Sequence, residues 1–143
     1  ADVLLERAEA FAQLGKTTEA IALVNQIRSR AASSTQMIGN YPSKYGVKFY
    51  CKNYTGSYDK EQTIKIVKME RRLELAMESE RFFDLVRWGE AAQTLNSYYA
   101  AEKTKCTVYG EAEFTADKGE YLPIPFAQVA ASNGYYTQNI GNW

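Results

Sequence analysis

Apolar residues at the start of the chain recur every three or four positions, the spacing of amphipathic helices. A first helix is predicted over residues 2–14, and Gly15 ends it because glycine readily takes the left-handed conformation that follows many helices. Its apolar face comprises Leu4, Leu5, Ala8 and Phe11. Thr17 or Thr18 is expected to cap a second helix. The apolar face of this second helix comprises Ala20, Leu23, Val24, Ile27 and Ala31. Together the two helices are predicted to form an antiparallel hairpin over residues 1–32.

This hairpin has the alternation of small and large residues that is typical of a tetratricopeptide repeat. The positions that carry the alternation are Ala8, Phe11, Ala20, Val24 and Ile27. The sequence contains no second copy, and a lone repeat leaves a hydrophobic face uncovered. The chain also opens without an initiator Met or a signal peptide. We therefore expect it to be part of a longer protein, whose preceding segment covers this face.

Residues 33–59 interrupt the helical pattern and are rich in Ser, Gly, Asn and Tyr. A loop of this length in a compact domain usually has a function or moves, and one short strand is predicted near Val47–Cys51. Ligand sites often combine flat apolar surfaces with a few polar groups between them. The candidates for contact with a ligand are Tyr41, Tyr45, Tyr50 and Tyr54. The alternative is that these tyrosines hold the loop against neighbouring helices.

A charged helix pair is predicted over residues 60–102. Asp59 is expected to cap a helix that runs to about residue 79, and a second helix follows from about residue 80 to 101. The apolar stripe of the first helix comprises Ile66, Met69, Leu73, Ala76 and Met77. Gly89 lies inside the second helix, where it is expected to allow close packing or a kink.

Opposite charges alternate within residues 70–89 at the spacing of helical neighbours. The charged residues that form this network are Glu74, Glu78, Arg81, Asp84 and Arg87. Paired carboxylates also catalyse glycoside hydrolysis. The interleaved arginines, however, are expected to lower the carboxyl pKa values, whereas a general acid needs a raised pKa. The pattern therefore favours a structural, partly buried ion-pair network that fixes the corner between two helices.

Residues 103–143 are predicted to contain short strands, a proline-rich segment and an irregular tail. A turn is expected at residues 116–119, and Pro125 is expected to open a short helix over residues 126–131. Asn133 and Gly134 are expected to form a further turn.

Composition narrows the classes of function. The 143 residues contain 17 basic and 17 acidic side chains, a balance that does not favour nucleic acid as a partner. There is no histidine, which removes the commonest general base and the commonest metal ligand. Cys51 and Cys106 lie too far apart for a metal site, and they form either free thiols or one disulfide. The sequence therefore predicts no metal, no cofactor and no catalytic activity.

Three segments, in this order along the chain, resemble the SusD/RagB family of surface glycan-binding lipoproteins of Bacteroidetes. Residues 1–31 resemble the last tetratricopeptide hairpin of the family. The run from Glu70 to Gly89, ERRLELAMESERFFDLVRWG, resembles the signature near its C-terminus. The segment YLPIPFAQVAASNGYYTQNIGNW resembles its closing segment, with Ile140 in place of the usual proline.

The resemblance implies a mainly α-helical fold in which residues 1–143 are the C-terminal region of a larger SusD-like protein. It implies an oligosaccharide ligand and two further partners, which are the N-terminal remainder of the same protein and a TonB-dependent outer-membrane transporter. It also implies a place on the outer-membrane surface, with a lipid anchor on the N-terminal part. The glycan-binding residues of the family lie mostly upstream, so this chain is expected to supply mainly structure. The alternative is a tetratricopeptide-type scaffold that contacts the transporter without touching sugar.

Overall fold

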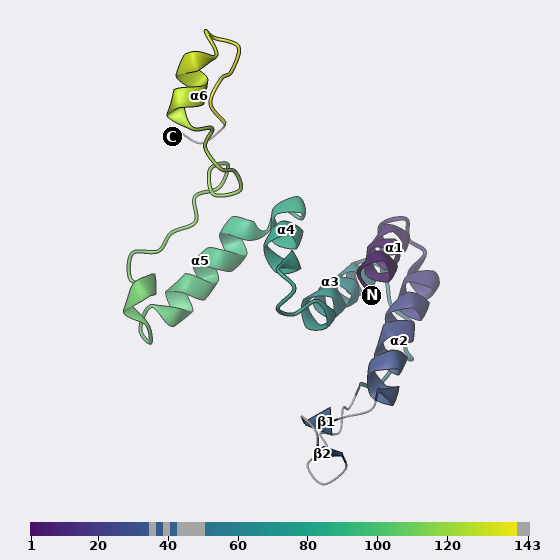
Figure 1. Ribbon diagram of the computed structural model, residues 1–143. Coiled ribbons are helices and arrows are strands. Elements are labelled where there is room, and N and C mark those ends of the chain that lie inside the picture. The colour runs from purple at the N-terminus through teal and green to yellow at the C-terminus, as the bar shows by residue number, and fades with distance from the viewer. Residues whose placement is uncertain (35–36, 39–40, 43–50, 140–143) are drawn as a thin grey trace. The chain divides into compact units, whose positions relative to one another are not determined.

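The computed structural model describes residues 1–34, 37–38, 41–42 and 51–139. These divide into two compact units, Ala1–Glu78 and Ser79–Trp143, which are described separately below. The described elements are α1 (Asp2–Gln13), α2 (Thr17–Ser33), β1 (Met37–Ile38), β2 (Tyr41–Pro42), α3 (Lys60–Glu74), α4 (Glu80–Arg87), α5 (Ala91–Glu102), the 3₁₀ helix η1 (Thr107–Tyr109) and α6 (Phe126–Ala131) (Figure 1). The mainly α-helical fold is thus confirmed.

The core of the first unit lies where α1, α2 and α3 pack together. Its fully or nearly fully buried members are Leu5, Ala8, Ala12, Ala20, Val24, Ile27 and Val67. Leu4, Phe11 and Leu23 pack against this cluster from its edge. The predicted apolar faces of the first two helices are therefore confirmed, apart from Ala31, which lies outside this cluster. Small alanines are among the buried residues of both helices.

The junction between α1 and α2 follows one part of the prediction and contradicts another. Gly15 has a φ of 75°, and the amide of Lys16 donates to the carbonyl of Phe11 over 2.9 Å. These features form a Schellman motif, which satisfies carbonyls at the end of α1. The predicted threonine cap is wrong, because Lys16 is the residue before α2 and no side chain caps this helix.

Helix α3 begins as predicted and ends earlier. The Asp59 carboxylate accepts from the Gln62 amide over 2.8 Å, and the Gln62 side chain accepts from the Asp59 amide over 3.1 Å, which makes a capping box. The helix stops at Glu74, and the chain then turns through Met77 and Ser79, both at a φ of 69°. The single helix predicted to residue 79 is therefore wrong.

Most of the apolar stripe predicted for α3 does not face the core, although Ile66 packs against its edge. Met69, Leu73 and Met77 are exposed, and Met77 lies beyond the helix. The buried face of α3 instead comprises Thr63, Val67, Glu70 and Arg71. The prediction failed because it counted only apolar residues, whereas two charged side chains on this helix are buried against partners on α1 and α2.

Two short strands, β1 and β2, pair antiparallel with Ile38 opposite Tyr41. The strand predicted near Val47–Cys51 falls on residues 47–50, outside the described part, and on Cys51, which has no regular structure.

In the second unit, the helix predicted over residues 80–101 is two helices. Gly89 has a φ of 69° between α4 and α5, and its amide donates to the carbonyl of Val86 over 3.0 Å. The amide of Glu90 donates to the carbonyl of Leu85 over 2.8 Å. Gly89 is therefore the residue that follows a helix end in a second Schellman motif, and the prediction of one continuous helix is wrong.

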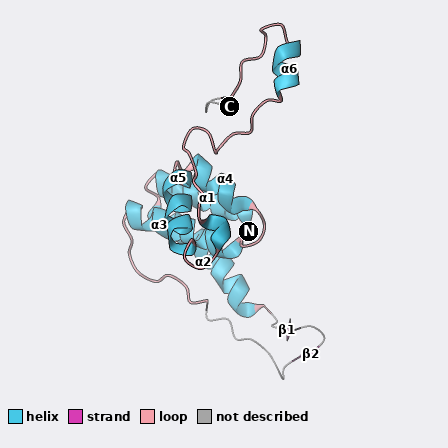
Figure 2. Cartoon of the chain, turned by 90° about the vertical axis from the view of Figure 1, so that its left-hand side faces the viewer, coloured by secondary structure: helices cyan, strands magenta, loops and turns pink. Residues whose placement is uncertain are grey.

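No strand occurs among the described residues 103–139, so the short C-terminal strands are wrong. Most of this segment is loop and turn, apart from η1 and α6 (Figure 2). The turns at residues 116–119 and at Asn133–Gly134 are confirmed, and α6 begins directly after Pro125 as predicted. Strands would need a pairing neighbour for their backbone groups, and here side chains provide the hydrogen bonds instead.

In the proline-rich segment these hydrogen bonds come from the side-chain amides of Gln138 and Asn139. The side chain of Gln138 accepts from the amide of Ile124 over 2.7 Å and donates to its carbonyl over 2.8 Å. Asn139 donates to the carbonyl of Leu122. The prolines on either side of Ile124 have no backbone N–H to donate. Gln138 therefore bonds to the one backbone N–H in Pro123–Pro125, which is that of Ile124.

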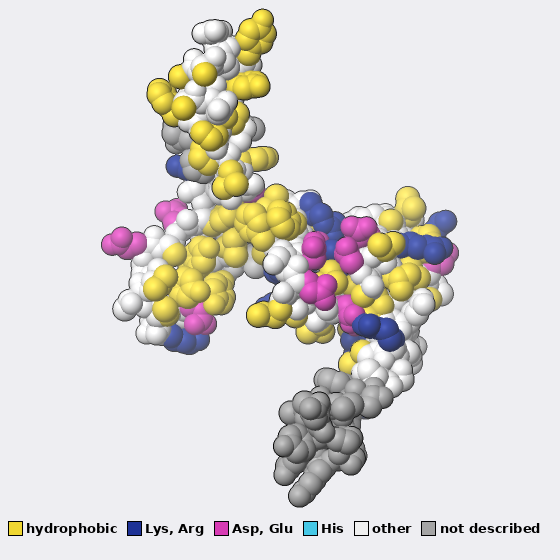
Figure 3. Space-filling view, in the orientation of Figure 1, with side chains coloured by type: hydrophobic (Ala, Val, Ile, Leu, Met, Phe, Trp, Pro, Cys, Tyr) yellow, Lys and Arg dark blue, Asp and Glu magenta, His cyan; other side chains and the backbone are white. Residues whose placement is uncertain are grey.

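Large apolar side chains of the second unit lie at its surface. Hydrophobic side chains gather over α4 and α5 (Figure 3). The exposed large hydrophobic residues here are Phe82, Phe83, Tyr98, Val108, Tyr121, Leu122, Phe126, Tyr135 and Tyr136. Within the residues that the structure describes, every helix is too short or too polar to cross a membrane.

Candidate functional site

Charged side chains of α3 join it to the other two helices of the first unit. Glu70 accepts from Arg28 of α2 over 2.7 Å, and the two side chains keep only 6% and 16% of their surface exposed. Glu74 pairs with Arg30 of α2, and the buried Arg71 pairs with Asp2 over 2.9 Å. The charge on this segment therefore serves packing between helices.

The predicted ion-pair network is thus arranged differently. Glu74 and Glu78 do not share a helical face, because α3 ends at Glu74 and Glu78 lies in the following turn. Within α4, Arg87 donates from Nη2 and Nε to the buried Asp84 carboxylate over 2.8 and 3.0 Å. The guanidinium of Arg81 lies 5.9 Å from the centre of the Trp88 ring. The spacing of charges along a helix correctly predicted the Asp84–Arg87 pair. It did not predict that Glu74 pairs with Arg30 of another helix.

Tyr54 is the candidate tyrosine whose side chain the structure describes. Its backbone amide and carbonyl both bond to the Asn25 side chain of α2 over 2.8 Å. Its ring packs against the core and lies 4.9 Å below the Arg28 guanidinium. These contacts give Tyr54 a role in holding residues 51–58 against α2.

Arg28 connects these features. Its Nε donates to the carbonyl of Lys52 over 2.6 Å, while its Nη1 bonds to Glu70. Burial acts to lower the pKa of the guanidinium, but the hydrogen bond and charge of Glu70 outweigh it, so the pKa of Arg28 is raised. Arg28 therefore stays charged and links α2, α3 and the loop.

The remaining candidate tyrosines cannot be brought into this geometry. Tyr45 and Tyr50 lie outside the described residues, and Tyr41 is described only as backbone in β2.

Beside the described end of the loop is an open groove of about 610 Å³ between α2 and residues 51–55. Ser29 and Asn53 bond to each other along it over 3.0 Å.

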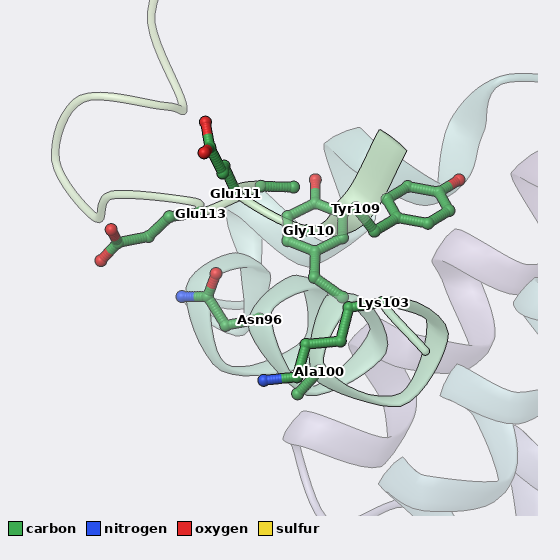
Figure 4. A pocket seen from close by; sticks show the side chains of 9 residues that line it. Asn96, Ala100, Lys103, Tyr109, Gly110, Glu111 and Glu113 are labelled. Atoms are coloured by element: carbon green, nitrogen blue, oxygen red, sulfur yellow. The ribbon is translucent and has the colours of Figure 1, made fainter. Parts of the chain in front are cut away.

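A second cavity lies in the second unit, in a part of the chain where the sequence indicated no function. Its volume is about 480 Å³, and one side is lined by Asn96 and Tyr99 of α5 and by Lys103, the residue that follows this helix. Tyr109, Glu111 and Glu113 line the other side. Figure 4 shows Asn96 and Ala100 on α5 and Lys103 at its end, while Glu111 and Glu113 extend from the segment after η1. We call this cavity the Tyr99–Tyr109 cleft.

Three tyrosines form a cluster at the cleft. The rings of Tyr99 and Tyr109 are stacked, with centres 5.6 Å apart and planes 17° apart. Tyr98 meets Tyr109 edge to face at 5.5 Å. A side-chain hydrogen bond with Tyr98 raises the pKa of the Tyr109 hydroxyl. The paired tyrosines Tyr98 and Tyr99 in the sequence were the available signal, but without the fold nothing placed Tyr109 beside them.

The described residues contain no group of three or more His, Cys, Asp or Glu side chains that could hold a metal ion. Cys51 and Cys106 are free thiols.

Comparison with known proteins identifies a family and a relative. The family model described as the SusD family matches residues 1–143. The chain is similar to a protein named SusD-like protein P38 from Formosa agariphila, with 39% identity over 95 residues. These residues make up 66% of this chain and 17% of that protein, so the chain matches a small part of its relative.

Proposed function

We propose, from the premise that the chain belongs to the SusD family, that it is the C-terminal region of a protein that binds glycans at the cell surface. Membership of this family implies a role in glycan binding within uptake systems of a SusC-type transporter and a SusD-type binding protein. The observation that carries the proposal is the match of the family model to residues 1–143. On this proposal the protein sits on the outer membrane through a lipid anchor on its N-terminal part.

The arrangement of the first unit supports a mainly structural share for this chain. Glu70, Arg71 and Glu74 of α3 are used in ion pairs with α1 and α2. Tyr54 holds the loop to α2. Side chains committed in this way are poor candidates for sugar contacts. The proteins of this family bind their ligands and are not enzymes, and we propose no catalytic step for Glu74 or Glu78.

A glycan-binding assay on the intact protein tests the proposal. We expect affinity electrophoresis to show slower migration in gels that contain at least one polysaccharide, with the polysaccharide left uncut. Serum albumin in the same gels is the control for non-specific retardation. Unchanged migration across a panel of neutral and acidic polysaccharides would contradict the proposal.

The loop tyrosines remain a separate part of the proposal. We propose that Tyr41, Tyr45 and Tyr50 border the glycan, because they are close together in the sequence, in a segment too polar to form core. The double variant Tyr45→Ala, Tyr50→Ala is expected to bind the glycan more weakly at unchanged stability. Tyr54→Ala is the matched control, because its contacts predict lost stability and unchanged affinity. Equal affinity of the double variant and the wild type would remove these tyrosines from the site.

The alternative function is a scaffold that contacts the transporter without touching sugar. The observation in its favour is the exposed apolar pair Met69 and Leu73 on α3, which keep 47% and 59% of their surface exposed. If the scaffold function holds, Met69→Ser with Leu73→Ser reduces co-purification of the TonB-dependent transporter and leaves glycan binding intact. Val108→Ser, an exposed apolar change in the other unit, is the control. Undiminished co-purification would exclude α3 from this contact.

A further inference from the structure

We propose that the Tyr99–Tyr109 cleft is a contact site for a neutral, pyranose-containing oligosaccharide. This inference rests on the proposed function, because it adds a second place at which the same protein holds sugar. It concerns residues 96–113, to which the sequence assigned no role.

The tyrosine cluster supplies the apolar surface that a sugar ring needs. Tyr99 and Tyr109 are half-buried, and their rings are stacked nearly parallel. Tyr98 supports Tyr109 from its edge. Because the rings hold one another in place before a ligand arrives, binding would cost little side-chain entropy.

Asn96 connects the two sides of the cleft. Its amide donates to the carbonyl of Phe114 over 2.9 Å, and its carbonyl oxygen accepts from the Phe114 amide over 2.8 Å. These two bonds hold the segment after η1 against α5. Asn96 is therefore a positioning residue, since its amide already bonds to backbone.

The polar groups of the cleft match the hydrogen-bonding needs of sugar hydroxyls. In the part of the chain that the structure describes, the side chains of Lys103, Glu111 and Glu113 form no ion pair and no hydrogen bond with the protein. An ammonium only donates and a carboxylate only accepts, whereas a hydroxyl does both. The cleft thus offers partners for both functions of a hydroxyl group.

The charges also select the class of sugar. Two carboxylates and one ammonium belong to the residues that line the cleft, so the local charge is negative and repels uronic acids and sulfated sugars. The volume of about 480 Å³ lies within the range of small-molecule sites. A neutral pyranose is the ligand that fits the rings, the hydroxyl partners and the charge together.

The test uses the intact protein and titration calorimetry. The probes are maltohexaose, cellohexaose and xylohexaose as neutral chains, with polygalacturonate as an acidic chain. We expect Tyr109→Ala to weaken binding of a neutral probe about tenfold, the scale of one lost aromatic contact. Tyr109→Phe keeps the ring and is expected to bind like the wild type. Tyr121→Ala, which removes an exposed tyrosine outside the cleft, is the matched control.

A second variant keeps the test conclusive if Tyr109→Ala does not fold. Lys103 is exposed, so Lys103→Ala leaves the ring stack in place and is expected to weaken binding about threefold through one lost hydrogen bond. Wild-type affinity in Lys103→Ala, or in a folded Tyr109→Ala, would overturn the site and leave the proposed function standing. If polygalacturonate binds best and is lost in Lys103→Ala, the neutral assignment is overturned. If the wild type binds no probe and no polysaccharide in the gel assay, the proposed function itself fails.

Discussion

The two units of the chain differ in how far their apolar side chains are buried. In residues 1–78, three helices bury a continuous cluster, and even the buried charges Glu70 and Arg71 of α3 are paired across helices. In the described residues from Ser79 onward, only Asp84, Leu85 and Ala91 are buried. There the chain is held by side-chain amides that bond to backbone and by contacts between aromatic rings. The first unit is therefore stabilised by its core, and the second by a few specific contacts.

This difference also separates structural residues from candidate ligand contacts. In the first unit, aromatic and charged groups such as Tyr54 and Arg28 contact each other. In the second, Lys103, Glu111 and Glu113 line a cavity while their side chains bond to no other described residue. Groups left unpaired beside stacked rings are available to a ligand. The comparison thus favours the second unit for the further ligand contact that we propose, while the described helices of the first unit are occupied with packing.

The largest expected effect comes from the core. Leu5 is fully buried, so Leu5→Ala should lower the free energy of unfolding by about 3–5 kcal/mol through lost burial and a residual cavity. Leu122→Ala removes the same atoms from a side chain that is 84% exposed, and should cost less than about 0.5 kcal/mol. Urea unfolding of both variants measures the difference. Equal losses would mean that the second unit has a core of comparable strength.

Breaking the buried ion pair should have the next largest effect. Glu70→Ala leaves Arg28 charged and mostly buried, which should cost about 3 kcal/mol. This is the low end for such pairs, because Arg28 keeps the carbonyl of Lys52 as an acceptor. Glu61→Ala breaks the exposed pair with Lys65 on the same helix and should cost less than about 0.5 kcal/mol. Similar costs for the two variants would show that water screens the Arg28–Glu70 pair.

The two helix-ending glycines allow one change to be compared in both units. Gly15 and Gly89 have φ values of 75° and 69°, and a Cβ at either would meet no atom within 4 Å. Alanine at either position should therefore cost about 1 kcal/mol through backbone strain alone. Thermal unfolding of Gly15→Ala and Gly89→Ala measures both costs. A much smaller cost at Gly89 would mean that α4 and α5 can merge into the single helix that the sequence predicted.

The sequence was informative wherever one local rule decided the structure. Apolar spacing located the buried face of the first hairpin, and Asp59 with Gln62 set the start of α3. Predictions from the sequence failed where a partner far along the chain determined the structure. No local pattern shows that Glu70 and Glu74 pair with α2. Gly89 could have been recognised as a helix end by the reasoning applied to Gly15. The Tyr99–Tyr109 cleft could not have been predicted from the sequence, because its two sides meet only after the chain turns back on α5.

The smallest effect tests whether the contacts of the second unit persist in solution. The hydrogen bond with Tyr98 raises the pKa of Tyr109 by stabilising its neutral form, so Tyr109 should titrate above about 10, the ordinary value for tyrosine. Because the folded pKa is the higher one, the stabilisation is complete below about pH 10 and is lost as pH rises through the pKa of Tyr109. Tyr98→Phe removes the hydroxyl and should return the pKa of Tyr109 toward the ordinary value. Absorbance of tyrosinate during a pH titration, with Tyr109→Phe to identify the signal, measures the shift. An unshifted Tyr109 in the wild type would mean that the tyrosine cluster is open in solution, and the second unit would then lack a preformed cleft.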